Sequence, residues 1–443
     1  MQKGKVKTFH IEAIFAGMHS TYWMSMCAFS GFMAVYLSYY GFSDALIGLT
    51  ASCISLISIT FQLGISSFSD ANAQISLKRI ITVIYLVVMG LVSLLALVPM
   101  PLVAMLLTYS LVGGVMNGMP GLFNAQIIQF VNEGLPVNLG WPRGVSALVY
   151  AIFAYFLGLL LDRFSPGILM PICLICIAFA IFMVLLMPRP ERRSPDESAI
   201  PDLAQPMPRT SFRQMLRSNP VMRFFLLSAV FMNAGQTNMM LFLARVVESR
   251  GGNETALGLA MFLQAGVEMP AMFLSSFLLR HFRARAILSV SAIAYFIKAL
   301  MIYLSRGIGE IYAAMAFSVF CYGLYGISSV YFVNSIVRPN ERVRGQSLVT
   351  ASGALSSIIS TSAAGWLVQT RGIGALNLVC VILQAIAAGL MFYCAWLHMR
   401  REKLQHTAGL KSQIQELMQV YQNRSNNHPR VIYKTTRPGG FVR

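Results

Sequence analysis

The stretch Pro188–Asn219 reads PRPERRSPDESAIPDLAQPMPRTSFRQMLRSN, a long polar interruption in a chain of 443 residues that is otherwise strongly apolar. Proline and charged residues at this density favour an irregular linker. Six long apolar blocks precede it and six follow it. They lie near residues 11–40, 43–68, 79–98, 101–130, 143–162, 167–187, 221–246, 255–280, 285–305, 309–337, 345–369 and 374–399. The linker therefore divides the chain into two equal sets of blocks.

The composition indicates that these blocks are membrane spans. Apolar residues make up 56% of the chain and charged residues only 11%, whereas a soluble domain carries about 25% charged residues. A helix needs roughly 20 apolar residues to cross a bilayer core about 30 Å thick, and tilt accommodates the longer blocks. We therefore predict an all-α membrane protein with twelve transmembrane helices.

The basic charge of the chain, +18 in total, follows the predicted topology. With both termini in the cytoplasm, most of the 34 Lys and Arg residues lie on the cytoplasmic side, as the positive-inside rule requires. Five arginines lie on the opposite side: Arg163, Arg245, Arg250, Arg306 and Arg371. The charge is thus an orientation signal for a protein of the cell (inner or plasma) membrane, and we expect no nucleic-acid partner.

The two sets of blocks resemble each other, which predicts two pseudo-symmetric six-helix bundles. RGVS at Arg143–Ser146 opens the fifth block, and RGQS at Arg344–Ser347 opens the eleventh. SSF ends the second block at Ser66–Phe68 and the eighth at Ser275–Phe277. Parallel repeats of this kind build one class of transporter. The expected domains are a bundle over 1–187, a cytoplasmic linker over 188–219, a bundle over 220–399 and a basic cytoplasmic tail over 400–443.

Two charges lie near the middle of predicted spans. Glu268 occurs in LQAGVEMPAMF and Lys298 in AYFIKALMIY, although a charge at mid-membrane costs about 2.5–3.5 kcal/mol. Each is 15 residues from Arg283, near the turn between their helices, so both lie roughly 22 Å from that turn. An acid and a base at one depth form either a structural ion pair or part of a water-filled cavity. Both readings remain open from the sequence.

Uncharged polar residues in other spans supply more candidates for such a cavity. Amides are costly in lipid and should face the interior of the bundle, where helix packing and ligand contact are equally good explanations. Arg143 and Tyr150 lie two helical turns apart on one helix face, a pairing that suits a hydroxylated ring compound. The amides are Gln62, Asn124, Gln126, Asn233 and Gln236. His19, in the first span, is expected to be an interior histidine with its hydrogen bonds satisfied.

These residues give the chain, over about 10–399, a resemblance to the lactose-permease-like branch of the major facilitator superfamily. That branch includes oligosaccharide:proton and nucleoside:proton symporters. YLSYYGFSDALIGLTASCISLISITFQLGISSFSD at Tyr36–Asp70 is similar to its first hairpin. GVEMPAMFLSSFLLRHFRARAIL at Gly266–Leu288 is similar to its eighth span, and YFVNSIVRPNERVRGQSL at Tyr331–Leu348 to the start of its eleventh. The resemblance implies the major facilitator fold.

The resemblance also implies roles for individual residues. Glu268 matches a carboxylate that acts in substrate binding and proton coupling, and Lys298 falls where the sugar symporters have an arginine. Arg143 matches the arginine that binds sugar hydroxyls, and Tyr150 the aromatic residue that stacks on the sugar ring.

The chain also departs from that pattern. Asn124 or Gln126 replaces one acid of the family, and Asn233 and Gln236 replace others. The stretch AAMAFSVFCYGLYGISSVYF (Ala313–Phe332) of the tenth span has no histidine or glutamate to match the family's coupling pair. Coupling would therefore depend on Glu268 with Lys298.

The predicted function is secondary active transport of a small polar solute, a sugar, oligosaccharide or glycoside, by proton-coupled alternating access. The alternatives are a proton-driven exporter of amphipathic drugs, a nucleoside:proton symporter, or a transporter-like sensor acting through its tail. We expect a monomer, no enzymatic activity, no cofactor and no metal, because no nucleophile–base pair, metal-ligand cluster or phosphate-binding loop is present in the sequence. Glycines at 113, 114 and 118 are expected to permit close helix packing.

Overall fold

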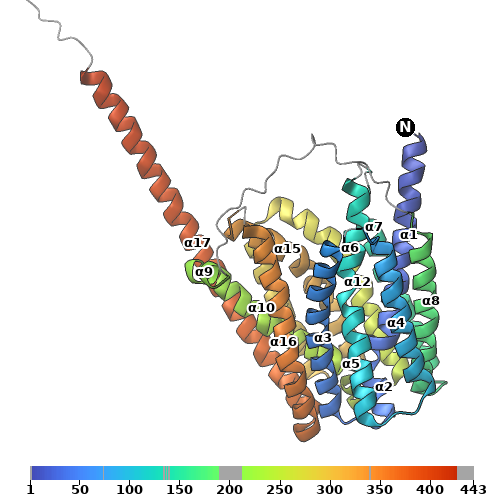
Figure 1. Ribbon diagram of the computed structural model, residues 1–443. Helices are drawn as coiled ribbons and strands as arrows, with labels where there is room; N and C mark the ends of the chain where they lie inside the picture. Colours follow the sequence, from blue (N-terminus) through green and yellow to red (C-terminus); the bar gives the residue numbers. More distant parts are fainter. Residues whose placement is uncertain are drawn as a thin grey trace, which may run out of the picture. The chain divides into compact units, whose positions relative to one another are not determined.

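A computed structural model describes residues 2–72, 74–132, 135, 137, 140–188, 212–338 and 341–426. All regular structure in these ranges is helical, and no strand occurs in them (Figure 1). The predicted all-α class is confirmed. Most of the predicted linker and the end of the predicted tail lie outside the described residues.

The first predicted span is not one continuous helix. It consists of α1 (Gln2–Met26), a π-helical turn η1 (Cys27–Gly31) and α2 (Met33–Tyr39). The Tyr109 hydroxyl donates a hydrogen bond to the Phe29 carbonyl inside η1. A side chain that inserts into the backbone ladder is a usual cause of such a break, and π-turns occur often at functional sites.

The remaining helices of the N-terminal half, defined here as residues 2–188, follow the predicted blocks. Ser43 caps α3, because its side chain accepts a hydrogen bond from the Leu46 amide. Pro120, which has no amide hydrogen, marks the break between α5 and α6. The helices are α3 (Asp44–Ala71), α4 (Leu77–Leu97), α5 (Leu102–Gly118), α6 (Pro120–Asn132), α7 (Gly140–Leu161), η2 (Pro166–Ile168) and α8 (Leu169–Leu186).

The C-terminal half is defined here as residues 212–394. Side chains of Asn219 and Asn253 cap its helices α10 and α12, as asparagine commonly does. The elements are α9 (Phe212–Ser218), α10 (Pro220–Leu241), α11 (Leu243–Ser249), α12 (Glu254–His281), α13 (Ala284–Leu304), α14 (Ile308–Ala316), η3 (Phe317–Phe320), α15 (Tyr322–Ile336), α16 (Arg342–Arg371) and α17 (Ile373–Asn426).

The described residues contain nine helices that are long and apolar enough to cross a membrane. The pair α10 and α11, bent by 56°, would make a tenth. The two remaining predicted spans are the first and the eighth. The first is the broken segment made of α1, η1 and α2, and the eighth is α12, of which Glu254–Val267 forms a shorter apolar helix. Each of the twelve predicted blocks is therefore helical, and the chain is a multi-pass membrane protein.

The chain divides into two compact units, Met1–Cys394 and Ala395–Arg443. The first contains both halves defined above. In the second, which begins within α17, the Arg400 guanidinium lies 5.5 Å from the centre of the Trp396 ring. His398 and Glu402 approach to 3.3 Å one helical turn apart. Residues 400–426 of the predicted tail are therefore a helix.

Within the first unit, close helix packing depends on small residues where it was predicted. In the N-terminal half, α1 packs against α7 and α8, and α3 packs against α5. A Cβ atom on Gly114 would lie 2.4 Å from Ile57, and one on Gly118 would lie 2.6 Å from Phe61. Two helix pairs join the halves: α3 with α16, and α7 with α12. Figure 1 shows α3 beside α16.

Candidate functional site

Paired glycines bring the backbones of the two halves into contact. A Cβ atom on Gly48 of α3 would lie 2.3 Å from the Thr361 carbonyl oxygen and 2.9 Å from the Cα atom of Gly365 in α16. The second helix pair repeats this arrangement. A Cβ atom on Gly158 of α7 would lie 2.5 Å from the Glu254 carbonyl oxygen and 3.1 Å from the Cα atom of Gly258 in α12. No larger residue fits at these crossings without separating the helices.

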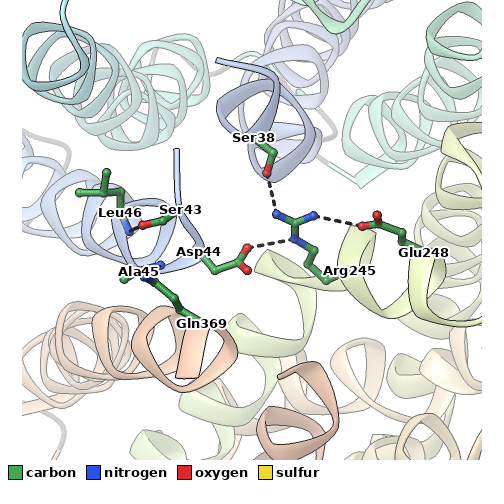
Figure 2. Close-up of polar contacts among 8 residues, drawn as sticks. All are labelled: Ser38, Ser43, Asp44, Ala45, Leu46, Arg245, Glu248 and Gln369. Atoms are coloured by element: carbon green, nitrogen blue, oxygen red, sulfur yellow. Dashed lines mark hydrogen bonds and ion pairs between the residues drawn. The ribbon is translucent and has the colours of Figure 1, made fainter. Parts of the chain in front are cut away.

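A charged network, which we call the latch, fastens the halves beside the first crossing (Figure 2). Arg245 of α11 donates from Nε to the Asp44 carboxylate at 2.9 Å and from Nη2 to the Ser38 hydroxyl at 3.1 Å. Its Nη1 donates to Glu248 at 3.1 Å on its own helix. The Arg245 and Asp44 side chains are 30% and 19% exposed. Bonds between charged groups in such half-buried positions are stronger than those at an open surface.

Further polar contacts cross between the halves on either side of the latch. Asp162 accepts hydrogen bonds from the Asn253 side chain at 2.7 Å and from the Thr255 hydroxyl. The Ser52 hydroxyl lies 2.7 Å from the Thr361 hydroxyl and donates to the Ile358 carbonyl at 2.7 Å. Together with the latch, these contacts tie α3 to α16 and α7 to α12.

All of these contacts lie toward one end of the molecule, which we call the latch end. They involve the first part of α3 and α12 and the last part of α7 and α16, and this end carries the turn at residues 40–43. The structure is therefore fastened at the latch end.

Arg143 and Asn124, both predicted site residues, contact each other. The Arg143 Nη2 atom at the start of α7 donates to Asn124 Oδ1 on α6 at 2.7 Å, and Arg143 is exposed. A guanidinium has five donors, so this contact leaves several for a ligand. The pair presents both donors and acceptors to hydroxyl groups.

Tyr150, two turns further along α7, forms an aromatic corner with Trp23 of α1. The ring centres are 6.1 Å apart and the rings are perpendicular, at 89°. Trp23 remains 38% exposed. A Cβ atom on Gly31 would lie 3.4 Å from the Tyr150 hydroxyl and 2.7 Å from the Met261 methyl group of α12, so the corner lies where the two halves meet. Trp23 was not among the predicted substrate-binding residues, although a tryptophan within a span that carries polar residues is a usable signal.

Lys298 lies fully buried on α13, and its Nζ atom donates to Gln264 Oε1 on α12 at 3.0 Å. Gln264 precedes Glu268 by one helical turn, so the two occupy one face of α12. The backbone of Glu268 lies in α12, while its side chain lies outside the described residues. The contact shows that Lys298 points toward the predicted face of α12. Because Lys298 has no exposed area, it does not line an open cavity in this conformation.

The other predicted amides are not gathered into one cluster. Asn233 donates to the Ala229 carbonyl of its own helix at 2.8 Å. Gln62 is exposed, and its Nε2 atom lies 3.6 Å from the position of a Cβ on Gly121. The Oε1 atoms of Gln126 and Gln236 are buried and have no hydrogen-bond partner among the described residues.

His19 is an interior residue, as predicted, but its expected hydrogen bonds are not found among the described residues. The side chain is 5% exposed, and neither ring nitrogen has a hydrogen-bond partner among the described residues. Its neighbours are the rings of Phe15, at 4.7 Å, and Phe123, at 5.7 Å. Aromatic carbon supplies packing but no acceptor, which is why the imidazole is left unsatisfied.

A profile of the MFS_1 like family matches residues 15–352. The chain belongs to this family. No curated protein sequence matches it, so the family assignment depends on the profile and agrees with the predicted major facilitator fold.

Solved structures agree with that fold. The nucleoside transporter NupG superposes with a TM-score of 0.68 at 16% identity, covering 87% of this chain and 98% of that chain. A bacterial homologue of the human lysosomal transporter Spinster, in an inward-facing and unoccupied conformation, gives a TM-score of 0.65 at 13% identity. That match covers 89% of this chain and 98% of the other. Identities this low support the fold alone.

The family membership and the site geometry agree on the general activity. Secondary transporters of this fold hold a solute between two halves that rock about it. Here the paired halves, the fastened latch end and the polar residues between them provide the parts of such a carrier. The chain is a secondary transporter of a small polar solute.

Proposed function

We propose that the chain carries a hydroxylated ring compound across the cell membrane together with protons. The observation that carries this proposal is the Arg143–Asn124 hydrogen bond beside the Trp23–Tyr150 corner. Guanidinium and amide groups bind hydroxyls, while an aromatic ring packs on the apolar face of a ring. Sugars and glycosides fit this combination.

A nucleoside is the second candidate, and Trp23 favours it. A nucleoside has both a hydroxylated sugar and a flat aromatic base, and two perpendicular rings provide a stacking face for each. The NupG structure, to which the fold is similar, is that of a nucleoside transporter. A sugar needs only one of the two aromatic faces, so removal of Trp23 separates the two candidates.

The proposed cycle alternates between a latch-closed and a latch-open state. The positive-inside rule places both termini in the cytoplasm, so the latch end faces outward and the present conformation is closed to the outside. Opening requires Arg245 to leave Asp44 and the glycine crossings to separate. In the proposed coupling, Glu268 binds a proton reversibly while Lys298 lies near it, and neutralising the carboxylate permits the loaded carrier to reorient.

A thermal-shift screen with sugars, glycosides and nucleosides on the purified monomer tests the substrate class. One class should raise the melting temperature of the wild type and of Arg163→Ala, a control at an exposed arginine outside the helices, but not of Arg143→Ala. Trp23→Ala should abolish the shift for a nucleoside and reduce it only partly for a sugar. Stabilisation by amphipathic drugs, unaffected by Arg143→Ala, would contradict the proposal and favour an exporter.

A further inference from the structure

A cavity of about 360 Å³, which we call the outer cavity, lies between the two halves at the latch end. The N-terminal half contributes residues of α2 and η2 to its wall, and the C-terminal half contributes residues of α11 and of the start of α12. Ligand sites in proteins have volumes of about 300–1,000 Å³, so a small organic molecule fits. Neither the Arg143–Asn124 pair nor the Trp23–Tyr150 corner lines this cavity, which makes it distinct from the candidate solute site.

The polar wall of the outer cavity carries an excess of carboxylates. Of the described residues that line it, Arg245 alone is basic, whereas Glu248 and Glu254 are acidic. The latch already engages the guanidinium, which donates to Asp44 at 2.9 Å and to Glu248 at 3.1 Å. Within the part of the chain that the structure describes, the second oxygen of Glu248 and both oxygens of Glu254 accept no hydrogen bond. Three carboxylate oxygens are therefore available to a ligand that donates hydrogen bonds.

Charges behind the wall reinforce this excess. Asp162 accepts a hydrogen bond at 2.7 Å from Asn253, which lines the cavity. Two arginines occur nearby in the chain without lining it. Arg250 donates to the Ser305 hydroxyl at 3.2 Å, and Arg163 is exposed to water, which screens its charge. The outer cavity therefore favours a cation over an anion.

The rest of the wall is apolar and suits a carbon body attached to that cation. Val35 of α2, Pro166 of η2 and Leu257 of α12 line the cavity. Tyr39 adds an aromatic residue that is 54% exposed, and the face of an aromatic ring attracts an ammonium group. Carboxylates for the head and carbon for the body together match an organic ammonium compound.

We propose that the outer cavity binds a small organic ammonium compound from the outside, and that this compound locks the carrier in the latch-closed state. Because both halves form the wall, opening the latch end separates Val35 and Tyr39 from Glu248 and Glu254 and divides the site. A ligand that binds only one of two states shifts the population toward that state. This inference rests on the proposed alternation between latch-closed and latch-open states, but not on the identity of the solute or on the coupled proton.

Calorimetric titration of the purified protein with tryptamine tests the binding. Tryptamine carries a primary ammonium on a flat apolar body, and tryptophol, which has a hydroxyl in place of the amine, is the matched neutral ligand. Tryptophol should bind about tenfold more weakly, because it lacks the charge that strengthens a hydrogen bond to a carboxylate. Glu254→Gln should weaken tryptamine binding about fivefold, as expected for the loss of one partly exposed ion pair.

The control variant for this titration is Glu310→Gln. Glu310 is exposed, lies outside the cavity wall and accepts a hydrogen bond from the Arg306 amide, which a glutamine oxygen also accepts. Its affinity for tryptamine should equal that of the wild type. Tryptamine binding that is unchanged in Glu254→Gln, or that is no stronger than tryptophol binding, would overturn the proposed site.

Alkylation of a cysteine between the halves tests the locking, and it needs no solute. Ser52→Cys replaces a residue whose hydroxyl lies 2.7 Å from the Thr361 hydroxyl across the first crossing, in protein whose seven native cysteines have been replaced. A water-soluble maleimide should reach this position only when the latch end opens. Tryptamine at about ten times its dissociation constant should slow the reaction about tenfold, and tryptophol at the same concentration at most about twofold. Alkylation that is unchanged or faster with bound tryptamine would overturn the locking.

The two assays separate this inference from the proposed function. Tryptamine that does not bind, while Ser52→Cys is alkylated, would overturn the outer site and leave alternating access intact. Ser52→Cys protein that is folded but never alkylated would overturn the proposed opening of the latch end itself. An amine that the protein exports would bind equally well to Glu254→Gln, and this result would also overturn the inference.

Discussion

Replacing Arg245 with alanine should weaken the contacts that hold the two halves together at the latch end. The substitution removes the two bonds that cross between the halves, to Asp44 at 2.9 Å and to Ser38 at 3.1 Å. A charged hydrogen bond contributes about 1.5–3 kcal/mol when sheltered, and an exposed ion pair contributes about 0–1 kcal/mol. The Arg245 and Asp44 side chains are 30% and 19% exposed, so the free energy that their contact contributes should lie between these two values.

We therefore expect the closed state to lose about 1–2 kcal/mol relative to the open state. At about 1.36 kcal/mol for each tenfold change, the ratio of open to closed molecules should rise roughly 5- to 30-fold. Opening will remain incomplete, because Asp162 still accepts hydrogen bonds from Asn253 and Thr255. Glu248→Gln is the matched control: it removes only the contact within α11 and should change the ratio less than twofold.

Spin labels at Tyr40→Cys and Ser249→Cys report the opening, in a background where the seven native cysteines have been replaced without loss of transport. Distance measurements between the labels should show a new, longer population in Arg245→Ala and in Asp44→Asn. The double variant Arg245→Ala/Asp44→Asn should differ from the wild type by less than the sum of the two single effects, because both changes remove one shared contact. Identical distance distributions in the wild type and Arg245→Ala would refute the latch.

Three further predictions concern the crossings and the site. Gly48→Trp should hold the latch end open and block transport without unfolding the protein, because even a Cβ atom at this position would lie 2.3 Å from the Thr361 carbonyl oxygen. Label-to-label distances equal to those of the wild type would contradict this. Asp162→Ala should also populate the open state, but less than Arg245→Ala does, because Asp162 is exposed. A larger open population in Asp162→Ala than in Arg245→Ala, measured with the same spin labels, would contradict this order. Arg143→Lys should weaken solute binding about tenfold, near 1.4 kcal/mol, because an ammonium cannot reproduce the planar donors of a guanidinium; unchanged affinity by calorimetry would remove Arg143 from the site.

The sequence predicted the membrane fold well, because a membrane span is recognised from the apolar composition of a whole segment and does not depend on any single residue. Each apolar block is helical, and the glycines at 113, 114 and 118 pack closely against neighbouring helices as expected. The break at Cys27–Gly31 was missed. That break depends on the Tyr109 hydroxyl from another helix, and no local pattern in the sequence records such a contact.

The candidate site was predicted only in part, for a similar reason. Arg143 and Asn124 do meet, and Lys298 does point toward α12, since helical spacing fixes which residues share a face. Spacing does not say which helices become neighbours. Trp23 and the latch residue Arg245 were therefore not predicted as substrate-binding or coupling residues. The interior position of His19 was predicted, but its expected hydrogen bonds are not found among the described residues, because one of its neighbours is the ring of Phe123, which is remote in sequence.

Uptake into proteoliposomes measures proton-driven transport of a hydroxylated ring compound. Purified protein is reconstituted, an acidic exterior is imposed, and labelled sugars, glycosides and nucleosides are followed with and without a protonophore. One of these classes should accumulate inside above its outside concentration if the protein is a proton-driven carrier of a hydroxylated ring compound. The protonophore should abolish the accumulation, and Arg143→Ala should abolish the uptake. Uptake that never exceeds the outside concentration, or that is the same with and without the pH gradient, would contradict proton-driven transport.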